Sequence, residues 1–161
     1  MLVDYNSLPD TSRVWVYQSD RKFNEEELSV IRKNASEFIE TWTRHGDQLK
    51  GGFSIKYDQF LVLAIDESFA NASGCSIDAS VRFVKQIEEQ LSVDMMNKLN
   101  VSFKDGSNIN IVSLADFQKY ARENKITNET IVFNNMVQTK GEVEQNWEVA
   151  AKDSWHSRFL N

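Results

Sequence analysis

The chain has 161 residues and a net charge of −6, with 26% charged and 41% apolar residues. This is the composition and length of one globular domain. The acidic balance argues against a nucleic-acid ligand, because that binding relies on clustered Lys and Arg. One cysteine, no signal pattern and no apolar run long enough to insert in a membrane predict a single cytoplasmic domain over residues 1–161.

The first half of the chain alternates strand and helix patterns. Arg13–Gln18 is rich in β-forming residues and predicts a strand. A helix should begin after Asn24, which can cap it, and end near Gly46. Residues 53–65 predict a hairpin whose second strand is continuously apolar, as in a central strand covered on both faces. Apolar residues at helical spacing predict a second helix over 77–91.

The second half of the chain predicts shorter elements. Residues 101–112 form a hairpin pattern, and Ser113 is placed to cap a third helix. Residues 130–133 predict a short strand, and 139–147 a short helix. The last segment, 153–161, is aromatic and mixed in charge, which predicts a docking tail.

These elements predict an α+β fold. The order strand, helix, strand, strand, helix, strand is that of the split βαβ or ferredoxin-like arrangement. A further hairpin and helix would extend it. We therefore expect a mixed or antiparallel sheet of five or six strands, with the helices mainly on one face.

The sequence lacks the usual catalytic signatures. It contains neither the G-x-x-x-x-G-K-[ST] phosphate loop nor the G-x-G-x-x-G dinucleotide turn nor the G-x-S-x-G elbow. No set of Cys, His, Asp or Glu has metal-site spacing. We therefore expect no cofactor and no metal, and the missing phosphate loop argues against ATP hydrolysis.

The segment Gly74–Asp78 is predicted to lie at the start of the second helix, where amides and the helix dipole favour negative charge. Cys75 could act there as a thiolate nucleophile. The amides of Gly74 and its neighbours could instead bind a small anion. The structural interpretation is the commonest one, because helix caps occur far more often than activated thiols. In it, Ser76 caps the helix, Asp78 complements the helix dipole and Cys75 is a small buried residue.

Other polar residues follow predicted strands, where ligands bind in open α/β sheets. Asp66, Gln18 and Asn134 could share a polar cleft with Cys75, although Asp66 also suits a turn or an ion pair. His156 could act as the base of a Cys75–His156 dyad, because such partners meet in space and not in sequence.

The tail carries three interface candidates, Trp155, Arg158 and Phe159. Trp155 and Phe159 are four residues apart, so one helical face can bury both. If this face packs on its own chain, the tail has a structural role. If it packs on another chain, it is an interface rich in residue types that dominate binding energy, and the partner is a second copy of this chain or another protein.

Five segments have distinctive sequences: SRVWVYQS (Ser12–Ser19), GCSIDASV (Gly74–Val81), IVFNN (Ile131–Asn135), NWEV (Asn146–Val149) and SWHSRF (Ser154–Phe159). With them the chain resembles, over nearly its whole length, a family of bacterial proteins of similar size that carry the label "ABC transporter ATPase". The label implies a nucleotide-binding subunit, whereas this sequence has no Walker A loop. The resemblance implies no catalytic residue.

The leading hypothesis is a non-catalytic binding or protein-interaction domain, with a homodimer as one form of it. The first alternative is an enzyme that uses Cys75, assisted by His156 or Asp66. The second is a small-anion site at the same helix start.

Overall fold

The computed structural model describes all residues, Met1–Asn161, and the chain forms two compact units. Unit 1 comprises Met1–Met96 with Gln138–Gly141, and unit 2 comprises Asn97–Val137 with Glu142–Asn161. Each unit has a sheet and a hydrophobic core of its own. The prediction of one domain over residues 1–161 therefore requires that the two units unfold together, which unfolding experiments can decide.

Unit 1 contains a three-stranded antiparallel sheet in the order β1 (Arg13–Gln18), β5 (Phe60–Ile65), β4 (Gly51–Lys56). In the centre of the register, Leu63 of β5 lies opposite Trp15 of β1 on one side and opposite a β4 residue on the other. All six residues of β5 are buried. The continuous apolar run therefore marks a central strand, as predicted.

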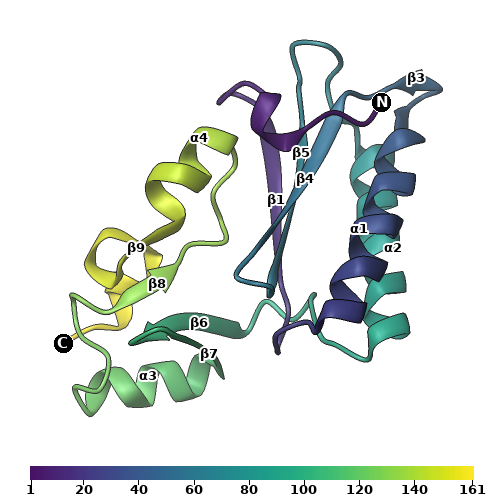
Figure 1. The fold of residues 1–161 in the computed structure, drawn as a ribbon. Helices are drawn as coiled ribbons and strands as arrows, with labels where there is room; N and C mark the ends of the chain where they lie inside the picture. The colour runs from purple at the N-terminus through teal and green to yellow at the C-terminus, as the bar shows by residue number, and fades with distance from the viewer. The chain divides into compact units, whose positions relative to one another are not determined.

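Two helices, α1 (Glu25–Glu40) and α2 (Gly74–Leu91), lie on the same side of this sheet (Figure 1). Asn24 caps α1 as predicted: its Oδ1 accepts from the amide of Glu27, and Glu27 Oε1 accepts from the amide of Asn24, both at 2.9 Å. The core between helices and sheet contains these fully buried residues: Ile31, Ala35, Ile39, Leu49, Leu61, Leu63, Ile65 and Val84.

The first helix ends five residues earlier than predicted from the position of Gly46. After Glu40 the chain forms a small hairpin of β2 (Thr43–Arg44) and β3 (Asp47–Gln48). Its turn residues, His45 and Gly46, both have positive φ angles of 50° and 85°. Glycine at a left-handed position suits a hairpin turn as well as a helix end, so the sequence signal was ambiguous.

Both outer strands of the unit 1 sheet have backbone partners from distant parts of the chain. On β1, the amide of Val14 donates to Gln138 O, and that of Lys140 donates to Ser12 O, each at 2.9 Å. On β4, the amide of Val3 donates to Gly51 O at 2.8 Å. Gly52, the next residue of β4, has no room for a side chain, because the N-terminal segment passes close to its Cα. A Cβ at this position would lie 2.8 Å from Val3 O.

Unit 2 contains a four-stranded antiparallel sheet in the order β7-β6-β8-β9. The strands are β6 (Asn100–Asp105), β7 (Asn108–Ser113), β8 (Ile131–Phe133) and β9 (Glu148–Ala150). Helix α3 (Leu114–Arg122) packs on one face, capped by Ser113, whose Oγ accepts from the amide of Asp116 at 3.1 Å. The buried core on this face contains Val101, Phe103, Phe117, Ile126, Val132 and Ala151.

The predicted helix over 139–147 is only partly regular. A single α-helical turn, α4 (Lys140–Glu142), continues as a π-helical turn over Val143–Trp147 and then enters β9. Strand β9 was not predicted, because three residues are too few to show an alternating pattern. No helix of the chain combines the length and apolarity needed to cross a membrane.

The α+β class and the antiparallel pairing are confirmed, and the division into sheets corrects the prediction of one sheet of five or six strands. The first three large strands do form the split βαβ arrangement, because β5 lies between β1 and β4. The expected fourth strand, β6, pairs instead with β7 and β8. Partner choice is non-local, so the pattern predicts that a strand exists but not which neighbour it takes.

Candidate interaction surface

The start of α2 differs in register from the prediction. Ser73, not Ser76, is the N-cap: its Oγ accepts from the amide of Ser76 at 3.3 Å, and Ser76 Oγ accepts from the amide of Ser73 at 2.6 Å. Gly74 is thus the first helical residue, and Asp78 is the fifth, beyond the first turn. Two serines three residues apart both fit a cap, and the extended backbone at Ser73 decides between them.

Cys75 is exposed, so the expectation that it is a small buried residue is wrong. It is the second residue of α2, and its thiol has no hydrogen-bond partner. Within unit 1 the structure therefore offers an accessible thiol with no hydrogen-bonded base, while one amide of the helix start, that of Ser76, is already satisfied by the cap.

Asp66 follows β5 and organises the loop that comes next. Its Oδ1 accepts from Ser68 Oγ at 2.5 Å and from the amide of Ser68 at 3.0 Å, and Lys50 Nζ lies 3.9 Å from Oδ2. The bond from the Ser68 hydroxyl lowers the pKa of this carboxyl. These contacts are those of a turn residue and an ion-pair partner, and none joins Asp66 to Cys75.

Gln18 and Asn134 belong to different units. Gln18 is buried at the end of β1, opposite Phe60. Asn134 closes a turn after β8: its amide donates to Trp147 O at 2.7 Å, and its Oδ1 accepts from the amide of Met136 at 3.1 Å. Because Phe60 begins β5 and Asp66 follows its last residue, Gln18 and Asp66 lie at opposite ends of the unit 1 sheet, and the predicted cleft that joins them is wrong. The part of Asn134 in a site with Cys75 stays a prediction.

His156 is part of the core of unit 2. Its ring has no exposed surface, stacks on Trp155 at 3.7 Å between ring centroids and lies 5.4 Å from Phe117. Ser154 Oγ is 2.8 Å from Nδ1. Burial lowers the pKa of His156 to about 4, so the ring is neutral at neutral pH. These contacts explain the residue structurally. Cys75 belongs to unit 1 and His156 to unit 2, so the Cys75–His156 dyad stays a prediction.

The aromatic tail packs on its own unit. Trp155 and Phe159 lie in a 3-10 helix, are half-buried and contact the unit 2 core. The guanidinium of Arg158 lies 6.0 Å from the Trp155 ring and 5.3 Å from the Phe159 ring. Asn161 Nδ2 donates to Ala121 O at 2.9 Å. The structure thus shows the tail packed on its own unit, and docking of the tail to another chain stays a prediction.

Unit 2 has an open cleft of about 730 Å³ between the end of the β6–β7 hairpin and the loop before β8. Its volume falls in the range of small-molecule sites. Its two ammonium groups are already engaged: Lys125 Nζ lies 3.1 Å from Glu123, and Lys104 Nζ lies 2.9 Å from Glu148. Of the two carboxylates that line it, Glu129 pairs with Lys152 at 2.9 Å, and Asp105 has no ion-pair partner. The cleft borders β7, which supplies three of its lining residues, Asn110, Ile111 and Val112.

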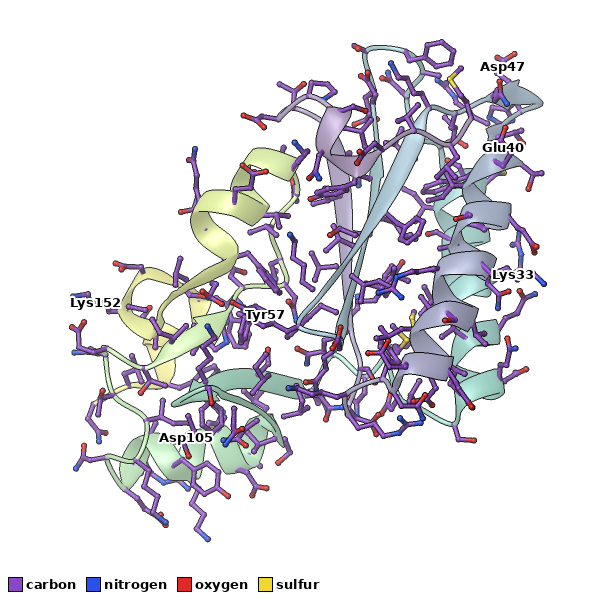
Figure 2. The ribbon with its side chains drawn as sticks, in the orientation of Figure 1. Lys33, Glu40, Asp47, Tyr57, Asp105 and Lys152 are labelled. Carbon is purple, nitrogen blue, oxygen red and sulfur yellow. The ribbon has the colours of Figure 1, made fainter.

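Strand β7 is the outermost strand of the unit 2 sheet and pairs on one side only, with β6. Beyond that pairing, its backbone has no hydrogen-bond partner. The four central residues, 109–112, are half-buried, and the two end residues are exposed. Figure 2 labels Asp105, the last residue of β6, which closes the hairpin that leads into β7.

The six residues of β7, NINIVS, contain no charge. The sequence predicted this hairpin but not that its second strand would be an edge. Edge strands commonly carry lysine, proline or a bulge that prevents pairing, so an uncharged strand gave no local signal of an edge.

No group of three or more His, Cys, Asp or Glu side chains is arranged to hold a metal ion. Comparison of the chain with protein-family models, with curated proteins and with solved structures found no match, so the resemblance to the bacterial family stays an expectation.

Proposed function

We propose that this protein is a non-catalytic protein-interaction domain whose docking element is the outer edge of β7. The observation that carries the proposal is the combination of an unpaired backbone edge, half-buried apolar side chains and no charge over six consecutive residues. We expect it to act in the cytoplasm, since its single cysteine cannot form an internal disulfide.

The backbone of β7 supports this function directly. The turn Gly106–Ser107 is a two-residue hairpin turn, with Gly106 at φ 63°, and its closing pair is Asp105–Asn108. Hydrogen-bonded pairs alternate from that point, so the amides and carbonyls of Ile109 and Ile111 point away from β6. An added strand would satisfy these groups, and each such bond contributes about 1 kcal/mol net.

The side chains of β7 supply the rest of the recognition. Ile109 and Ile111 share one face of the sheet, and Asn110 and Val112 share the other. A strand added at this edge would contact two apolar side chains on one face and border the cleft on the other. This is the β-augmentation mode, in which backbone bonds give affinity and alternate side chains give specificity.

The test is a peptide-display selection on sparsely immobilised wild-type protein, with counter-selection on an Ile111→Lys variant. We expect the selected peptides to alternate apolar and polar residues. In anisotropy titrations Ile111→Lys should weaken their binding at least about tenfold, because it adds a charge to the edge and removes a cross-strand partner.

Asn128→Lys is the matched control, because it adds the same charge at an exposed loop position of unit 2. It should bind the selected peptides like the wild type. A selection that yields no peptide, or peptides that bind the wild type and Ile111→Lys equally, would refute β7 as the docking element.

A second candidate function, a Cys75-dependent enzyme, is favoured by one observation, the exposed thiol at the second residue of α2. We expect this thiol to react with a disulfide reagent in the native protein, without denaturant. The measurement is the reaction rate across a pH series, with Cys75→Ser as the blank. A pH profile that changes in His156→Gln would support the dyad, and an unchanged profile would remove it.

A further inference from the structure

We infer that the occupant of the β7 edge is β7 of a second copy of this chain, paired antiparallel about a two-fold axis through Asn110. This inference rests on the proposed function and names its partner. It predicts one continuous sheet of eight strands across two chains, in the order β9-β8-β6-β7 followed by the same strands reversed.

Charge is the first argument for a second copy. A two-fold axis places each strand against itself, so any charge near the axis would face its own like charge. The chain carries a net charge of −6, yet residues 108–113 carry none. An edge made for a basic partner would carry acidic residues, and an uncharged edge is the one that tolerates its own copy.

Sequence symmetry is the second argument. The segment Ile109-Asn110-Ile111 reads the same in both directions. With Asn110 opposite its own copy, Ile109 lies opposite Ile111 of the second copy, and Ile111 lies opposite Ile109. Both isoleucine pairs then fall on one face of the sheet, where cross-strand pairs of β-branched residues stabilise pairing.

Backbone direction is the third argument, because it is independent of the side chains. The outward-pointing groups of β7 are those of Ile109 and Ile111, while those of Asn110 point toward Phe103 of β6. The register through Asn110 therefore brings the outward groups of Ile109 to those of Ile111 in the other copy. Asn110 forms the non-hydrogen-bonded pair at the axis, where Cα atoms lie about 4.5 Å apart.

The test is disulfide cross-linking, since the register predicts which position meets itself. In a Cys75→Ser background, Asn110→Cys should form a covalent dimer under mild oxidation, because its Cα separation suits a disulfide. Asn108→Cys is the control: in this register the two copies of residue 108 lie about 14 Å apart along the strands. Residue 108 is also more exposed than residue 110, so random collisions would favour the control.

Light scattering after size exclusion gives the second measurement, on the full chain over three orders of magnitude of concentration. We expect the wild type and Asn128→Lys to approach twice 18.6 kDa at the upper end. Ile111→Lys should raise the dimer dissociation constant at least about tenfold, and circular dichroism would confirm that it is folded.

The outcomes separate this inference from the proposed function. A dimer with cross-linking at position 110 and not at 108 supports both. A monomer at every concentration, or cross-linking at 108 that equals or exceeds that at 110, overturns the second-copy inference. If the displayed peptides still bind in an Ile111-dependent way, the proposed function stands without it, and if they do not, both are refuted.

Discussion

The sheets of the two units differ in whether their outer strands have backbone partners on the second side. In unit 1, β1 pairs with the segment around Thr139, and β4 pairs with the N-terminal segment at Leu2. Both strands also carry a charge, at Arg13 and Lys56. In unit 2, β7 has six residues, no charge and no second partner. Since unprotected edges pair with other chains, the contrast indicates that only one of these sheets is available to a partner strand.

The comparison also concerns stability, because a central strand and an edge strand bury different amounts of apolar surface. Leu63 of β5 is fully buried, whereas Ile111 of β7 is half-buried.

The largest effect is expected in the centre of unit 1. Leu63→Ala should lower the free energy of unfolding by about 3 kcal/mol, because the lost side chain leaves a cavity in the core. Ile111→Ala should cost only about 1 kcal/mol, because water already reaches that side chain. Urea denaturation of both variants measures the difference. Equal losses would mean that β7 is as deeply packed as β5.

The same variant tests whether the two units form the one domain that the sequence predicts. If they unfold together, Leu63→Ala in unit 1 should lower the stability of β8 amides in unit 2 by the same amount, about 3 kcal/mol. Native-state hydrogen exchange with mass spectrometry follows each strand separately. A loss confined to unit 1 would show two cooperative units and contradict the single-domain prediction.

Acid should destabilise the chain through His156. Its folded-state pKa of about 4 lies below the ordinary value of 6.5. As the pH falls, the unfolded chain therefore binds the proton first. The stability due to this residue is complete above about pH 6.5 and is lost as the pH falls toward 4, by about 3 kcal/mol at most.

The measurement for His156 is the difference between the wild type and His156→Phe in urea midpoints across that pH range. Taking the difference cancels the contribution of the carboxyl groups to the pH dependence of stability, because these groups titrate in both proteins. The phenylalanine variant should be less sensitive to acid, with no buried imidazole to charge. Parallel profiles would show that the ring is already solvated in the folded state.

The smallest effect is expected at the cap of α1. Asn24→Ala should cost about 1 kcal/mol, because it leaves the amide of Glu27 without the side-chain acceptor seen at 2.9 Å. Asn71→Ala, at an exposed loop position, is the matched control and should be neutral within about 0.5 kcal/mol. Thermal melts of both variants suffice, and equal shifts would argue against the capping box.

Part of the fold could be predicted because its causes are local. Asn24 and Ser113 cap helices through amides three residues away, and the alternation of residues 13–18 marks a strand within its own length. The Gly74–Asp78 segment was located correctly at a helix start. Its register was not, because Ser73 and Ser76 carry the same local signal.

The candidate site residues were less predictable, because burial depends on neighbours that are distant in sequence. The sequence pattern predicted a buried Cys75, and it is exposed. His156 was named for its chemistry, and its surroundings, Phe117 and Trp155, show a core residue. The β7 edge was overlooked because a hairpin pattern does not reveal which of its strands takes another neighbour.

By itself, the sequence determined the kinds of elements and most of their boundaries. It also determined the helix caps at Asn24 and Ser113, the two hairpins and the buried character of β5. Those features depend on hydrogen bonds and periodicities that span a few residues. Only the tertiary structure decided that β6 leaves the sheet of β1, that Gln138–Lys140 returns to cover β1, and that β7 is left as a bare edge. Strand pairing joins segments far apart in the chain, so its outcome depends on the packing of the whole unit.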